Sequence, residues 1–149
     1  MSPDRGAGIE VAWTVGGTRL LSDDEVRRAA AAACDHGGRP GIALSIVFVS
    51  DADLARLHDR HLDDPRPTDV ITFDLGDGGP GVAAELYVSP ERARIVARER
   101  DLAPDRELAL YVVHGCLHLC GYDDRRPADR ALMRAAERAV LEQLGHEER

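Results

Sequence analysis

The pattern of apolar and polar positions along the 149 residues predicts nine secondary-structure elements. Four short apolar segments, bounded by Gly, Pro, Asp or Ser, have the length and composition of strands. They are residues 9–15, 42–49, 69–75 and 83–89. Five segments with helical spacing or capping signals are expected as helices. The first helix follows Ser22 and ends at about residue 35, and the second covers 51–61. The third starts at Ser89-Pro90, and the last two cover 105–119 and 127–144. The order β-α-β-α-β-β-α-α-α predicts a mixed sheet covered by helices.

The ends of these elements are marked by residues with known local preferences. Ser22 is a predicted N-cap, and the acids that follow it suit the first turn of a helix. Glycine pairs or single glycines are expected to end three of the helices, at 37–38, 121 and 145. Segment 42–49 is almost wholly apolar, which predicts a central strand that is buried on both faces.

Length and composition predict a single domain over 1–149, with 1–8 as a loose tail and 9–145 as the folded part. A chain of this length can bury a core without disulfides. It has three cysteines, no apolar run long enough for a membrane helix, and a polar start without the features of a signal peptide. We therefore expect a cytoplasmic protein with reduced thiols.

The formal net charge is -8, and all basic residues are arginines. This balance argues against indiscriminate nucleic-acid binding, but it leaves room for a local arginine-lined groove. Such a basic wall is a possibility for Arg92, Arg94, Arg98 and Arg100 together with the arginines of the last helix.

The segment HGCLHLCGYDD, residues 114–124, has the spacing of a metal site. On a helix, His114 and His118 lie about 40° apart, so that both imidazoles can reach one ion. Gly121 can turn the chain so that a carboxylate of the following Asp pair becomes a third ligand. Three protein ligands with one open position are typical of catalytic zinc. The alternative is that both histidines are ordinary helix residues.

The cysteines of the same segment are expected to serve a different purpose. Cys116 and Cys120 each lie about 200° around the helix from a histidine, so one ion cannot easily use both pairs. Two small apolar core residues are the favoured interpretation. A peptidase of the HExxH type would have its glutamate base at position 115, where this chain has glycine. The sequence therefore favours another metal-assisted hydrolysis.

These residues closely resemble the signature His-Gly-x-Leu-His-Leu-x-Gly-Tyr-Asp-His of the YbeY family, metal-dependent single-strand endoribonucleases of ribosomal RNA maturation and ribosome quality control. The segments PTDVITFDL (67–75) and AAELYVSPERA (83–93) resemble two further family blocks. The resemblance covers roughly residues 40–145. It implies an α+β fold, with a mixed four-stranded sheet, five to six helices and a zincin-like metal-binding helix.

The resemblance implies one zinc ion bound by His114, His118 and Asp124, the last in place of the family's third histidine. The family also has an arginine before Pro-Thr-Asp, which is thought to act on the substrate phosphate, and ungapped alignment places it at Leu62. We expect Arg60 to substitute for it as the catalytic arginine, with Arg66 as the alternative, and a solvated surface arginine is an equal interpretation of each. The resemblance implies single-stranded RNA, rRNA and the ribosome as substrates and partners. It implies no association with a membrane.

Further residues receive weaker expectations. Asp123 is expected to orient a histidine, and Tyr122 to cap or pack the site. Thr68 and Asp69 start a predicted strand, and they are expected to lie beside the cleft that contains the metal site. An equal alternative is that their side chains only stabilise a turn. His58 and His61 are expected at the surface, with the cleft as the alternative.

Three functions stay open from the sequence. The first is a zinc-dependent single-strand endoribonuclease in rRNA maturation. The second is a ribosome-associated RNA-binding factor that keeps the fold and the metal but has weakened or lost cleavage, which the residues at 62 and 124 would favour. The third is a metal-dependent hydrolase of another substrate.

Overall fold

The structure, a computed structural model, describes residues 8–62, 69–76 and 81–146, with only the backbone at 61–62. The strands are β1 (Ile9–Trp13), β2 (Leu44–Phe48), β3 (Val70–Asp74) and β4 (Ala84–Val88). The helices are α1 (Asp23–Gly37), α2 (Asp51–Leu62), α3 (Pro90–Arg100), α4 (Pro104–Leu119) and α5 (Pro127–Gln143). The predicted order of elements is confirmed, and their ends shift by at most two residues.

The four strands form one mixed sheet in the order β1-β2-β4-β3. β1, β2 and β4 run parallel, and β3 pairs antiparallel with β4. The parallel neighbours are joined through helices, as crossover connections require, whereas β3 and β4 follow each other directly. The predicted α+β fold with a mixed four-stranded sheet is confirmed, and five helices lie in the described part of the chain.

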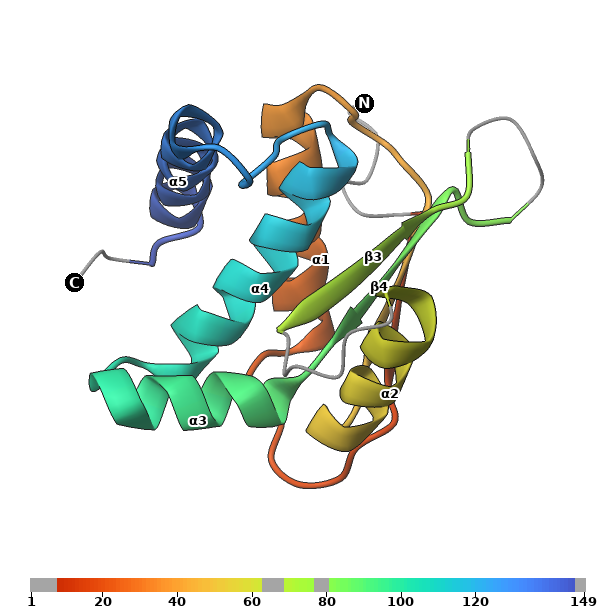
Figure 1. Ribbon diagram of the computed structural model, residues 1–149, viewed down its shortest axis with the longest axis vertical. Coiled ribbons are helices and arrows are strands. Elements are labelled where there is room, and N and C mark those ends of the chain that lie inside the picture. Colours follow the sequence, from red (N-terminus) through yellow and green to blue (C-terminus); the bar gives the residue numbers. More distant parts are fainter. Residues whose placement is uncertain (1–7, 63–68, 77–80, 147–149) are drawn as a thin grey trace.

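Helix α4 is the centre of the helical layer. It contacts α1, α3 and α5, and it also packs directly on β3 and β4. Figure 1 shows α4 between the sheet and α5, while α2 lies on the other side of β3. This position surrounds α4 on most sides, so each of its faces meets a different neighbour.

The sheet buries its two faces to different extents. Alternate residues of β2 and β4 point into the main core under α1 and α4, and all are buried; they are Leu44, Ile46, Phe48, Ala84, Leu86 and Val88. The opposite face has a small second cluster under α2, with Val49, Leu54 and Ile71 buried. The prediction that strand 42–49 is buried on both faces is wrong, because Ser45 and Val47 stay half-buried where the short helix α2 covers the sheet incompletely.

The predicted helix signals act as expected. Ser22 and Glu25 form a reciprocal capping box at the start of α1, and Gly38 ends the helix with a φ of 90°. Ser89 caps α3, with Pro90 at its first turn. None of the described helices combines the length and the apolar character needed to cross a membrane.

Candidate metal centre

The two histidines lie on the last two turns of α4, on one face of the helix. Their Nε2 atoms are 3.1 Å apart, and the ring centroids are separated by 4.6 Å. Side-chain exposure is only 20% for His114 and 29% for His118, because α5 and the following loop lie against them. The i,i+4 spacing therefore brings two imidazole nitrogens to one point, as the sequence predicts.

The end of α4 returns the chain toward this point. Gly121 has a φ of 102°, and its N–H donates to the His118 carbonyl. The Tyr122 N–H donates to the Leu117 carbonyl, which completes the Schellman pattern that a left-handed residue after the helix allows. The Asp123 carboxylate then accepts the Asp124 N–H at 2.7 Å. This turn directs the next side chain, Asp124, back to the histidines.

His114, His118 and Asp124 form a nearly equilateral triangle of ligand atoms. Asp124 Oδ2 lies 3.5 Å from His114 Nε2 and 3.6 Å from His118 Nε2. Ligands of a tetrahedral zinc ion with metal–ligand distances near 2.0–2.1 Å are roughly 3.3 Å apart. Two nitrogens and one carboxylate oxygen at this spacing fit zinc, and among the described residues this is the one group of such ligands.

Glu137 of α5 completes the site from outside the triangle. Its Oε2 lies 2.5 Å from His114 Nδ1, and its side chain is only 12% exposed. A carboxylate at this nitrogen accepts the Nδ1 proton and leaves the Nε2 lone pair for a metal ion. Glu137 therefore fixes the tautomer and the orientation of His114 and raises its basicity.

The electrostatic balance at His114 agrees with this arrangement. Burial lowers the pKa of the ring, but the nearby carboxylates outweigh burial, so that the pKa lies above its ordinary value. Glu137 contributes most to this increase, followed by Asp69 and Asp124. The site therefore attracts positive charge, and a bound cation is one way to supply it.

Comparisons with known proteins agree on one family. The model of the family "Endoribonuclease YbeY" matches residues 20–145. An endoribonuclease YbeY of Chloroflexus aggregans is 41% identical, covering 85% of this chain and 94% of that protein. Another, from Rhodopirellula baltica, is 38% identical over 85% of this chain, which spans only 64% of that protein. The chain belongs to the endoribonuclease YbeY family.

A solved structure supports the fold of this YbeY family member. The solution structure of a Thermotoga maritima protein matches with a TM-score of 0.59 and 24% identity, and the match covers 91% of this chain and 90% of that one. The names of the related proteins support a nuclease that acts on RNA.

Two hollows meet at the metal centre, and both are lined by Asp69, His114 and Asp124. The first, between α3, α4 and α5, has a volume of about 400 Å³. The second, beside β3 and α2, has a volume of about 690 Å³. Both volumes lie in the range of small-molecule sites. The metal centre therefore opens to a hollow on each side of the ligand triangle.

Several weaker predictions are changed by the structure. Asp123 does not orient a histidine; its carboxylate accepts the backbone N–H groups of residues 124 and 125, and Glu137 has the expected role instead. His58 is not a free surface residue, since it is half-buried and lines the second hollow. Tyr122 packs against the main core.

The other residues near the cleft have separate outcomes. Asp69 lies beside the cleft as predicted and lines both hollows. Thr68 and Arg66 lie outside the described residues, as does the side chain of His61. Arg60 is exposed near the end of α2 and is absent from the lining of both hollows, so its catalytic role stays a prediction.

The cysteines are core residues, as predicted. Cys34 and Cys116 are buried, Cys120 is half-buried, and all three are free thiols. A hydrogen bond with the Cys34 thiol, followed by burial, raises the pKa of Cys120 far above its ordinary value. Metal binding needs the thiolate form, so the Cys120 thiol is a poor ligand.

Gly115 explains how α4 comes so close to the sheet. A Cβ atom at this position would lie 2.9 Å from Leu86 Cδ2 and 3.0 Å from Val70 Cγ2. The glycine lets the backbone of α4 approach the sheet this closely. The glycine thereby brings the histidine face of α4 to the edge strand β3.

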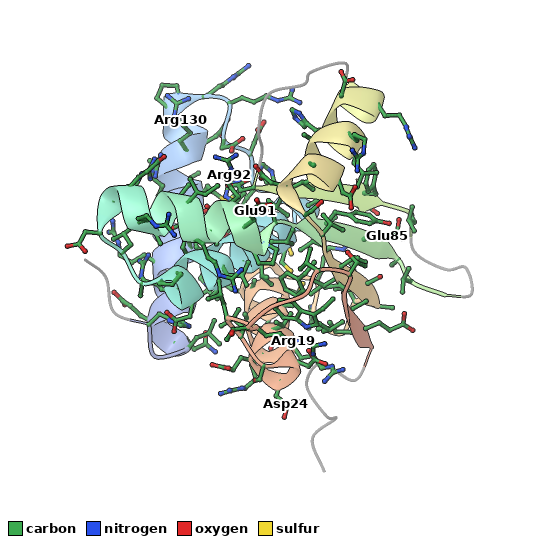
Figure 2. The ribbon with its side chains drawn as sticks, turned by 90° about the horizontal axis from the view of Figure 1, so that it is seen from below. Arg19, Asp24, Glu85, Glu91, Arg92 and Arg130 are labelled. Carbon is green, nitrogen blue, oxygen red and sulfur yellow. The ribbon has the colours of Figure 1, made fainter. Side chains whose placement is uncertain are left out.

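The expected basic wall is only partly formed. Arg92 pairs with Asp51, with Nη2 and Oδ2 2.5 Å apart, and Arg94 donates to the Thr18 carbonyl. Figure 2 shows Arg92 at the start of α3 and Arg130 at the start of α5. Arg130 lines the first hollow together with Arg100 and Arg134. The wall therefore forms on the α5 side of the metal centre, while the first two turns of α3 use Arg92 and Arg94 for contacts within the fold.

Proposed function

We propose that the chain is a zinc-dependent endoribonuclease that hydrolyses phosphodiester bonds of single-stranded RNA in rRNA maturation and ribosome quality control. The observation that supports this most is the triangle of His114, His118 and Asp124, whose edges of 3.1–3.6 Å fit one tetrahedral ion. Membership of the YbeY family supplies the class of substrate. rRNA and the ribosome are the partners that this proposal implies.

Each residue of the site has a defined task in this proposal. His114, His118 and Asp124 hold the ion, and Glu137 keeps the Nδ1 proton of His114 away from the ligand position. Zinc, when bound, supplies Lewis-acid stabilisation of a phosphoryl oxygen and activates water. The hollows on both sides admit the strand, while the half-buried ligands limit competing solvent. Arg60 remains our predicted contact to the substrate phosphate.

The replacement of the family's third histidine by Asp124 is compatible with metal binding. A carboxylate is an accepted zinc ligand, and here its oxygen lies at nearly the same distance from both histidines. This geometry supports a site that still binds metal over a decayed one.

The experiment is cleavage of a labelled single-stranded RNA by the purified protein, stripped with a chelator and then supplied with Zn²⁺. We expect restored cleavage in the parent and a loss on the order of 10³-fold in His118→Ala, since a lost ligand removes several kcal/mol of charge stabilisation. Duplex RNA and single-stranded DNA of the same sequence serve as substrate controls, and circular dichroism checks the fold.

A different result would point to the other functions. If Zn²⁺ restores no cleavage in the parent, but the double variant Asp124→His/Leu62→Arg cleaves, the parent is an RNA-binding factor without turnover. If RNA is never cut and a peptide or another ester is, the proposed substrate class is wrong.

A further inference from the structure

The hollow between α3, α4 and α5 has a different chemistry from the one beside β3. Three arginines reach it from two helices: Arg100 from the last turn of α3, and Arg130 and Arg134 from successive turns of α5. Among the described residues, the hollow beside β3 has one arginine, Arg125. Within that part of the chain, cationic side chains are thus concentrated on one side of the metal centre.

Among the described residues, three of the four acids that line the same hollow are already engaged, and the fourth, Asp69, makes no ion pair with the arginines. Glu107 is only 4% exposed and accepts the Tyr111 hydroxyl. Glu137 is held by His114 Nδ1, and Asp124 lies at the ligand position. These carboxylates therefore have neighbours of their own and do not neutralise the arginines by direct pairing.

Two of the three arginines have no such partner. Arg130 donates through Nη1 to the Arg125 carbonyl at 3.1 Å, and this bond ties α5 to the loop that bears Asp124. Within the described residues, Arg100 and Arg134 make neither a hydrogen bond nor an ion pair. Both guanidinium groups are therefore available to an external anion in the hollow that His114 and Asp124 also line.

We propose that Arg100 and Arg134 form a subsite for a backbone phosphate of single-stranded RNA, adjacent to the phosphodiester at the metal centre. This inference rests on the proposed function. It adds that the RNA strand occupies the hollow between α3, α4 and α5, on one side of the metal centre. Guanidinium groups bind phosphate through paired N–H donors, and a volume of about 400 Å³ admits a nucleotide-sized group. The two arginines are positioning residues, because they contact the strand at a phosphate other than the one that is cleaved.

The test is steady-state cleavage of a labelled single-stranded RNA by the zinc-loaded protein, over a series of salt concentrations. The double variant Arg100→Gln/Arg134→Gln is compared with Arg28→Gln/Arg98→Gln. The control pair removes the same charge from exposed arginines of α1 and α3 that line neither hollow at the metal centre. Equal midpoints of thermal unfolding establish that both double variants fold. If a double variant does not fold, its two single variants are measured instead.

We expect KM of the subsite variant to rise about tenfold or more, as for the loss of a charge-assisted hydrogen bond, with kcat within about twofold of the parent. The slope of log KM against log salt should fall by about 0.7 for each phosphate that the variant no longer neutralises. The control variant should keep the parent's KM and slope.

Two outcomes overturn the subsite while the proposed function stands: a KM and salt slope equal to those of the control variant, or a fall in kcat with KM unchanged. A parent that neither cleaves nor binds the RNA, measured by fluorescence anisotropy, overturns the proposed function and the subsite together.

Discussion

Two faces of α4 bear pairs of potential metal ligands at the same i,i+4 spacing, and only one pair meets the conditions of a metal site. His114 and His118 face the hollows and converge with Asp124. Cys116 and Cys120 face α1, where Cys34 and Gly37 pack against Cys120. Ligand spacing is therefore not decisive; what covers the face decides between a site and a core.

The largest expected difference between the faces is in metal content. His118→Ala should reduce bound zinc from about one per chain to a small fraction, because two protein ligands hold zinc poorly. Cys120→Ala, the same substitution two residues further along the helix, should leave it unchanged. Elemental analysis after gel filtration measures both, and metal retained in the histidine variant or lost in the cysteine variant would reverse the assignment.

A second prediction sharpens the contrast through α5, which supports only the histidine face. Glu137→Gln keeps the size of the side chain and removes its charge, so His114 becomes a weaker ligand. We expect zinc affinity to fall about 10–100-fold. Competition with a chromophoric chelator measures it. Glu142→Gln, at an exposed position of the same helix, is the control and should match the parent.

The smallest expected effect concerns the cysteine face. In Gly37→Ala the new methyl group would overlap the side chain of Cys120, at a cost of about 1–3 kcal/mol. Alanine is favoured over glycine in helices by up to about 1 kcal/mol, so the net loss of stability should be about 1 kcal/mol. Urea unfolding tests this against Gly16→Ala, whose Cβ meets nothing within 4 Å. Zinc content should stay constant, and a simultaneous loss of metal would couple the two faces.

The sequence predicts well those features that depend on neighbours in the chain. The two histidines and the turn after Gly121 lie within eleven residues, and helix geometry with a left-handed glycine is enough to bring Asp124 to them. Caps such as Ser22 and Ser89 are equally local. The order of elements follows from apolar periodicity together with these local capping signals.

Features that depend on packing between distant elements are missed. Glu137 lies 23 residues from His114 and reaches it because α5 packs on α4. A signal was present, since Glu137 is an acid on the buried stripe of α5 beside Met133, Ala136 and Val140. The incomplete cover of β2 likewise depends on the length and placement of α2, which the strand's own residues do not specify.

Gly115 has a consequence for the range of reactions open to this scaffold. Peptidases of the HExxH type use a glutamate at this position as general base. Here the position faces Leu86 and Val70 at a distance that excludes even a methyl group without rearrangement. The close seating of α4 on the sheet thus prevents a single substitution from installing that base, and an evolutionary or engineered route to peptide hydrolysis would have to recruit the base from another element.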